Sequence, residues 1–204
     1  MDSYERVLGC FYGAAIGDAM GAATETMTPQ MILDRYGAYV DQLLAPGDGT
    51  FSAGCPAGFV TDDFSLAYFT ALEILKAPDG PICDTTAQTA LINWSGHPEY
   101  FCFAGPSTSV AIKKILGEPV PQPPVIPACD NSRASNGSAM KIFPAGLKNP
   151  GRPEHAVTDA ITLCKPTHDN AASLSAACAI AAACRFAVSA PRPMLVPARA
   201  RRRP

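Results

Sequence analysis

Thr61-Asp62-Asp63 opens an apolar run, Phe64 to Leu75, whose length and composition predict a helix. Three oxygen-bearing side chains in a row at a helix start suit one of two roles: they cap the helix, or they hold a hard cation. A cap needs only one side-chain oxygen, and one nearby carboxylate complements the helix dipole. Two adjacent carboxylates exceed that need and repel each other unless a cation lies between them. The tripeptide alone is compatible with both interpretations.

The N-terminal segment is also predicted to be helical, from residue 3 to about residue 23. Gly9, Gly13, Gly17 and Gly21 recur every four residues and therefore share one face of this helix. Each glycine costs a helix about 1 kcal/mol relative to alanine. Four glycines in register thus predict the close approach of a second helix. The adjoining core face is expected to consist of Val7, Leu8, Phe11 and Ala15.

The rest of the chain continues the helical pattern. Thr28-Pro29 starts a short helix that Gly37 ends, and residues 41–60 are rich in glycine and proline and read as a loop. Further helices are predicted over 64–76, 85–94, 108–116, 155–164 and 169 to about 184, with a turn at 136–140 that leads into another. No segment alternates polar and apolar residues as a half-buried strand does. The predicted class is all-α, a compact orthogonal bundle of several helices.

The composition excludes some classes of function. The 204 residues are 48% hydrophobic with a net charge of -2, enough for one core and without bulk attraction to nucleic acid or anionic membranes. The N-terminus has no signal-peptide pattern, and no apolar run is long enough to span a membrane. None of the eight cysteines forms a CxxC pair. We interpret them as reduced core residues of a cytoplasmic protein.

The last twenty residues differ from the rest. No acidic residue follows Asp169, and residues 185–204 carry six arginines among prolines without helical periodicity. This segment is expected to be a disordered or non-native tail, following a single domain over residues 1–184.

Four motifs together resemble one family. Residues 13–25 (GAAIGDAMGAATE) resemble the opening signature of ADP-ribosylglycohydrolases, and Thr61-Asp62-Asp63 resembles their metal-binding motif. Residues 135–141 (SNGSAMK) and Thr167-His168 resemble two later motifs in the same order. The resemblance implies an all-α fold with two Mg²⁺ or Mn²⁺ ions, and hydrolysis of a glycosidic bond at C1″ of ADP-ribose. The implied partner is an ADP-ribosylated protein or a small-molecule ADP-ribose conjugate.

The resemblance also implies roles for individual residues. The metal ligands implied in this part of the chain are Glu25, Thr61, Asp62 and Asp63. Among these, the acidic groups Asp62, Asp63 and Glu25 are implied as catalytic, positioning or deprotonating water. The implied substrate-binding residues are Asn136, Gly137, Ser138 and His168. Asp18, by contrast, is interpreted as structural, hydrogen-bonded to a neighbouring helix end.

The sequence departs from the family pattern in one respect. Members of the family take further metal ligands from an Asp-x-Asp-Thr run near the C-terminus, and this sequence contains no such run. We therefore expect a chain that lacks the C-terminal part of its domain and has impaired activity. The alternative is a catalytically inactive ADP-ribose-binding module or truncated pseudo-enzyme. The acceptor group, the choice of Mg²⁺ or Mn²⁺ and the oligomeric state are not fixed by the sequence.

Overall fold

A computed structural model describes residues 3–120, 131 and 133–189, and the regular elements among these residues are all helices. The predicted all-α class is therefore confirmed. The elements are α1 (Ser3–Gly21), α2 (Pro29–Tyr36), α3 (Asp62–Leu75), α4 (Asp84–Ser95), α5 (Pro98–Phe101), α6 (Pro106–Ile115), a 3₁₀ turn η1 (Asn136–Ser138), α7 (Phe143–Lys148), α8 (Pro153–Cys164) and α9 (Ala171–Ser189).

The helix boundaries follow local chemistry. Thr28 caps α2 by accepting a hydrogen bond from the Met31 amide, and Gly37 ends the helix in the left-handed region at φ 71°. The one helix not predicted is the single turn α5, which begins at Pro98 directly after α4. Proline suits the first position of a helix, because it has no N–H to satisfy and its φ is already helical.

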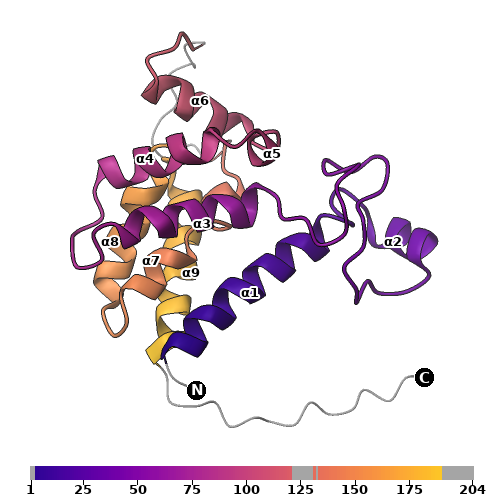
Figure 1. The fold of residues 1–204 in the computed structure, drawn as a ribbon, viewed down its shortest axis with the longest axis horizontal. Helices are drawn as coiled ribbons and strands as arrows, with labels where there is room; N and C mark the ends of the chain where they lie inside the picture. Colours follow the sequence, from indigo (N-terminus) through magenta and orange to yellow (C-terminus); the bar gives the residue numbers. More distant parts are fainter. Residues whose placement is uncertain (1–2, 121–130, 132, 190–204) are drawn as a thin grey trace.

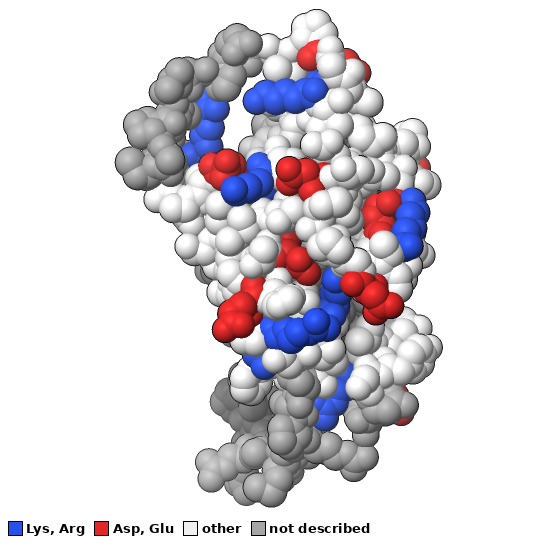
Figure 2. All heavy atoms as spheres, turned by 90° about the vertical axis from the view of Figure 1, so that its left-hand side faces the viewer, with Lys and Arg blue, Asp and Glu red and all other residues white. Residues whose placement is uncertain are grey.

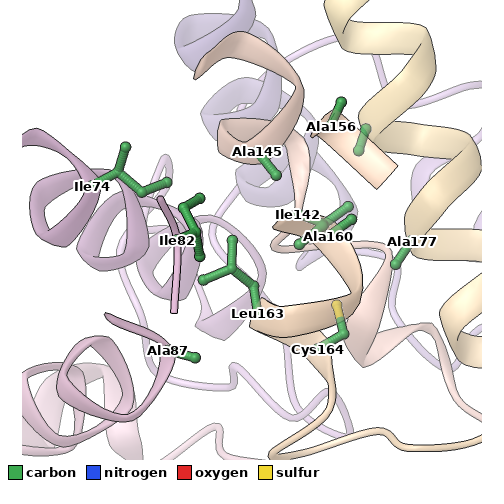
Figure 3. Packing of buried hydrophobic residues seen from close by; sticks show 11 residues of the cluster. Ile74, Ile82, Ala87, Ile142, Ala145, Ala156, Ala160, Leu163, Cys164 and Ala177 are labelled. Atoms are coloured by element: carbon green, nitrogen blue, oxygen red, sulfur yellow. The ribbon is translucent and has the colours of Figure 1, made fainter. Parts of the chain in front are cut away.

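The main core lies where α7, α8 and α9 meet α3 and α4 (Figure 1). Figure 3 shows small alanine side chains between these helices, with Ile142 and Leu163 filling the wider gaps. A second cluster joins α3, α4 and α6 around Trp94, which is fully buried and donates its indole N–H to Ser65. Trp94 is thus the centre of this second cluster.

The glycine stripe of α1 does not serve as predicted. A Cβ added at Gly9, Gly13, Gly17 or Gly21 would meet no atom within 4 Å, so no second helix of the described chain approaches this face. Leu8, predicted as core, is 39% exposed, and Ala19 is the one buried residue of α1. In Figure 1, α1 runs away from the helical core toward α2, with its start beside the end of α9.

Close helix packing uses a different glycine. A Cβ at Gly146 in α7 would collide with the backbone oxygen of Ala181 in α9, and it would lie 3.0 Å from the Cβ of Cys184. Glycine at this position lets α7 and α9 pack directly on each other. The two kinds of glycine look alike in sequence, and only the fold separates them.

The cysteines that the structure describes are free thiols, as predicted, but the prediction that they lie in the core holds for one residue. Cys164 is buried, but Cys83 and Cys102 are exposed, because both flank the ends of short helices at the surface. Cys129 and the predicted tail beyond Ser189 lie outside the described residues. Residues 185–189, assigned to the tail by sequence, instead continue α9.

The described surface carries charges of both signs. On the face drawn in Figure 2, lysine and arginine side chains alternate with aspartate and glutamate across a largely uncharged surface. Among the helices that the structure describes, none is long and apolar enough to cross a lipid bilayer.

Candidate functional site

Asp18 of α1 caps the helix that carries the acidic motif. Its Oδ2 accepts hydrogen bonds from the backbone amides of Thr61 at 2.8 Å and Phe64 at 3.1 Å, and its Oδ1 accepts from the Thr61 hydroxyl at 2.7 Å. Thr61 itself occupies the N-cap position of α3 without a capping bond from its own side chain. The structural interpretation of Asp18 is therefore confirmed. Because Asp18 of α1 caps α3, the carboxylates of Asp62 and Asp63 are not needed as helix caps and are available for binding.

The acidic residues around this cap disfavour one another's charge. Burial raises the pKa of Asp62 to about 7, and the neighbouring charge of Asp63 adds to the shift. Burial and then the charge of Asp18 raise the pKa of Asp63. Partial burial and then the charges of Asp63 and Asp18 raise the pKa of Glu25. Such a cluster favours either a proton or a cation between its members.

A cavity of about 410 Å³ lies directly in front of this cluster. Its walls come from α1 and the turn after it, from the start of α3, and from η1 with the residue two positions beyond it. The lining residues are Ala14, Gly17, Asp18, Gly21, Ala22, Glu25, Thr61, Asp63, Phe64, Asn136 and Met140. Two glycines of the α1 stripe therefore form part of the cavity wall.

The predicted site residues fall into two sets. Glu25, Thr61, Asp63 and Asn136 line the cavity together, although 111 positions separate Glu25 from Asn136 in the sequence. The other predicted residues lie outside the cavity lining: Asp62, Gly137, Ser138 and His168.

The backbone directly after Glu25 is strained. The next residue, Thr26, has a φ of 65° in the left-handed region, which costs a β-branched residue roughly 1 kcal/mol or more.

The loop opposite the acidic residues is held by hydrogen bonds to α9. Ser138 donates its hydroxyl to the backbone oxygen of Ser173 at 2.8 Å, and the Ser173 hydroxyl donates to the backbone oxygen of Ser135 at 3.2 Å. Ser138 and Ser173 are almost completely buried. Ser173 was not predicted as part of the site, because nothing in the sequence pattern of α9 distinguishes this serine from its neighbours.

His168 lies beneath the loop with both ring nitrogens engaged. Its Nε2 is 2.9 Å from the Ser135 hydroxyl and its Nδ1 is 2.9 Å from the Thr167 hydroxyl. Burial, with a smaller effect of the nearby Lys141 charge, lowers the pKa of His168 to about 4, so the ring is neutral at pH 7. The ring is 4% exposed and packs directly against Gly137.

The sequence matches one protein family along nearly its whole length. The profile of the ADP-ribosylglycohydrolase family matches residues 1–202. This chain belongs to that family. The match extends beyond residue 184, where the sequence alone presents no motif of ADP-ribosylglycohydrolases.

Two curated relatives match most of the chain. It is 31% identical over 184 residues to the uncharacterized protein YegU of Escherichia coli (strain K12), covering 87% of this chain and 52% of the relative. It is 27% identical over 175 residues to the ADP-ribosyl-[dinitrogen reductase] glycohydrolase of Rhodospirillum rubrum, covering 86% of this chain and 55% of the relative. The chain thus spans about half the length of these curated relatives.

Metal binding, a general property of ADP-ribosylglycohydrolases, can be tested against the donor groups of the cavity. Thr61, Asp63 and Glu25 present hydroxyl and carboxylate oxygens to one space, the hard donors that Mg²⁺ prefers. Within the described ranges, no group of three or more acidic, cysteine or histidine side chains converges closely enough to hold a metal ion. Mg²⁺ is commonly held by one or two carboxylates together with waters and substrate oxygens. The donors present fit that mode of binding.

Proposed function

We propose that this chain binds an ADP-ribose conjugate in the cavity and hydrolyses the glycosidic bond at C1″ in a Mg²⁺-dependent reaction. The observation that carries the proposal is the pairing of two unlike walls across one cavity. An acidic wall from α1 and α3 faces a hydrogen-bonded loop that presents Asn136. Membership in the ADP-ribosylglycohydrolase family supports the reaction class. The relative from Rhodospirillum rubrum is named for an ADP-ribosylated protein, which supports a protein-linked substrate.

In this proposal the acidic wall holds the reacting end of the substrate. Thr61, Asp63 and Glu25 would hold Mg²⁺, or Mn²⁺ in its place, with Asp62 adjacent. When bound, the metal supplies positive charge that orients ribose hydroxyls and makes a nearby water more acidic. A carboxylate of Glu25, Asp62 or Asp63 accepts a proton from the attacking water. As the bond at C1″ breaks, the same carboxylates stabilise the positive charge that develops on the sugar.

The loop wall holds the distal part of the substrate. Asn136 faces the cavity, and its side-chain amide can donate to a diphosphate oxygen or to a ribose hydroxyl. Gly137 and Ser138 form the buried base of the loop, which holds Asn136 in place. The two walls together suit a ligand with an electropositive reacting end and an anionic middle.

A hydrolysis assay tests the proposal. The purified chain is incubated with peptides ADP-ribosylated on arginine or on serine, in Mg²⁺ or in EDTA, and released ADP-ribose is measured. Release with Mg²⁺, no release with EDTA, and loss of at least about 100-fold in Asp63→Asn would support it. The matched control is Asp34→Asn, because Asp34 lies on exposed α2, where it accepts a bond from Gln30. Absence of turnover on every conjugate in Mg²⁺ and Mn²⁺ would contradict the hydrolase proposal.

A second candidate is an ADP-ribose-binding module without hydrolysis. It is favoured by the small number of acidic ligands that converge in the described residues. Under this alternative, ADP-ribose binding by calorimetry persists in EDTA while the hydrolysis assay gives no product. Binding that requires Mg²⁺ would count against the module.

A further inference from the structure

Five polar groups form a continuous chain from the interior to the loop wall. Buried Lys141 donates from Nζ to the Thr167 hydroxyl at 2.7 Å, and the same hydroxyl contacts Nδ1 of His168 at 2.9 Å. Nε2 of His168 contacts the Ser135 hydroxyl at 2.9 Å, and that hydroxyl accepts from the Gly137 amide at 3.3 Å. Their connection could not be predicted from the sequence, where the five residues belong to two separate motifs.

The two ring contacts of His168 are compatible with either tautomer, and the hydrogen bond from Thr167 to the backbone is the observation from which we assign a direction to this chain. Thr167 has one hydroxyl proton, which it donates to the backbone oxygen of Cys164 at 3.2 Å. It therefore accepts from Lys141 and from Nδ1–H of His168, because an ammonium group has no acceptor. Nε2 of the neutral ring is then left to accept the Ser135 proton. Ser135 in turn keeps its lone pairs for the Gly137 amide.

Steric contact ties the loop to the same ring. A Cβ at Gly137 would lie 2.7 Å from both Cε1 and Nε2 of His168, closer than real Cβ contacts. The loop backbone therefore rests directly on the imidazole, in the position that leads Asn136 into the cavity. The orientation of the ring consequently decides where the loop lies.

We propose that Thr167 is a positioning residue, whose hydroxyl sets the tautomer of His168 and thereby holds the loop Ser135–Ser138 in its ligand-ready conformation. Thr167 acts from beneath the loop and does not line the cavity. The hydrogen-bonded chain exists without ligand, whereas its effect on ADP-ribose affinity rests on the proposed function. Lys141 contributes by donating to one lone pair of the Thr167 oxygen, which leaves the other lone pair for Nδ1–H of His168.

The first test needs no ligand. Nitrogen-15 NMR of the imidazole at pH 7 and hydrogen exchange of the Gly137 amide are measured in four variants. Thr167→Val removes the hydroxyl, Thr167→Ser restores it, Ser135→Ala cuts the last link, and Thr158→Val is the control. Thr158 is an exposed residue of α8 whose hydroxyl donates to the backbone oxygen of Glu154 in the same helix. We expect wild type, Thr167→Ser and Thr158→Val to show the Nδ1–H tautomer and a protected Gly137 amide.

Loss of the links should be measurable in the other two variants. Thr167→Val is expected to give a mixture of tautomers, and both it and Ser135→Ala to exchange the Gly137 amide about tenfold faster. Ser135→Ala leaves no buried charge without a partner. It therefore tests the hydrogen-bonded chain even if Thr167→Val fails to fold. An unchanged tautomer in a folded Thr167→Val, or unchanged exchange in Ser135→Ala, would overturn the proposal.

Calorimetry with ADP-ribose then tests the consequence for binding. The dissociation constant should rise about tenfold in Thr167→Val and return to within about twofold in Thr167→Ser. If wild type binds and Thr167→Val binds equally well, the positioning role is wrong. If wild type itself does not bind ADP-ribose, the proposed function fails, and the NMR result still decides whether the hydrogen-bonded chain exists.

Discussion

The two walls of the cavity differ in how their polar groups are compensated. On the loop wall, Ser135, Ser138 and His168 satisfy one another and α9 through short-range hydrogen bonds. On the acidic wall, burial raises the pKa values of Asp62, Asp63 and Glu25, and the charges of neighbouring carboxylates, Asp18 among them in each case, add to the shift. The loop wall is therefore preorganised without a ligand. On the acidic wall, the carboxylates repel one another, and a bound cation would relieve this repulsion.

Asp18 is the exception on the acidic wall, and its loss should have the largest effect. Asp18→Ala removes three hydrogen bonds at the start of α3 and leaves the amides of Thr61 and Phe64 without their acceptor. Since bonds to a carboxylate contribute more than neutral ones, we expect the free energy of unfolding to fall by about 3 kcal/mol. Urea denaturation measures it.

The control for this variant is Asp34→Ala on exposed α2. It should change the free energy of unfolding by less than about 0.5 kcal/mol. If the two variants lose equal stability, the cap on α3 does not hold the acidic wall as the hydrogen bonds suggest.

The two walls should respond to pH in opposite directions when metal is chelated. The folded pKa of Asp62 is raised from 3.8 to about 7, so the folded state binds more protons across that range and stability falls as pH rises through it. The folded pKa of His168 is lowered from 6.5 to about 4, so stability rises with pH between those values.

Two variants separate these opposite changes in the free energy of unfolding with pH. Asp62→Asn should remove the decline in stability between pH 4 and 7, and His168→Gln should remove the opposing rise between pH 4 and 6.5. Denaturation at a series of pH values in EDTA measures both. Identical pH profiles for wild type and both variants would show that neither wall carries the electrostatics assigned to it.

The smallest effect is expected from a link of the loop wall. Ser173→Ala removes a hydroxyl that donates to the Ser135 carbonyl and accepts a longer bond from the Ser135 amide, and the exposed Ser135 can bond to water instead. We expect a loss of about 1 kcal/mol, measured by thermal denaturation. Ser109→Ala, which removes a longer bond of 3.4 Å to the Ala104 carbonyl, is the matched control and should cost less. A larger loss in the control would argue that the loop wall is not unusually ordered.

The sequence predicts the fold and the candidate site to different extents. Apolar periodicity predicted the helices because it is a local property, and Thr28 and Gly37 marked the ends of α2 correctly. The glycine stripe of α1 led to a wrong prediction of close helix packing. The spacing of residues shows which of them share a helix face, but it does not show what packs against that face. Gly146, which does permit close packing, has no such pattern around it.

Part of the candidate site was also predictable. Resemblance to ADP-ribosylglycohydrolases identified Glu25, Thr61, Asp63 and Asn136, and the fold brings these four to one cavity. The chain from Lys141 through Thr167 to Ser135 was not predicted. Its hydrogen bonds join residues up to 33 positions apart in the sequence. The direction of each bond depends on which group donates its proton. Such pairings arise from packing and leave no periodic trace.

The most direct test of the central claim is a thermal melt of the chain alone, with Mg²⁺, with ADP-ribose, and with both. If the acidic wall needs a cation and the loop wall is ready for the ligand, the pair should raise the melting temperature more than the two separate shifts combined. A ligand at about 100 times its dissociation constant adds about 2.7 kcal/mol to stability, enough to detect readily. A cooperative melt that neither ligand nor their combination shifts would contradict the account.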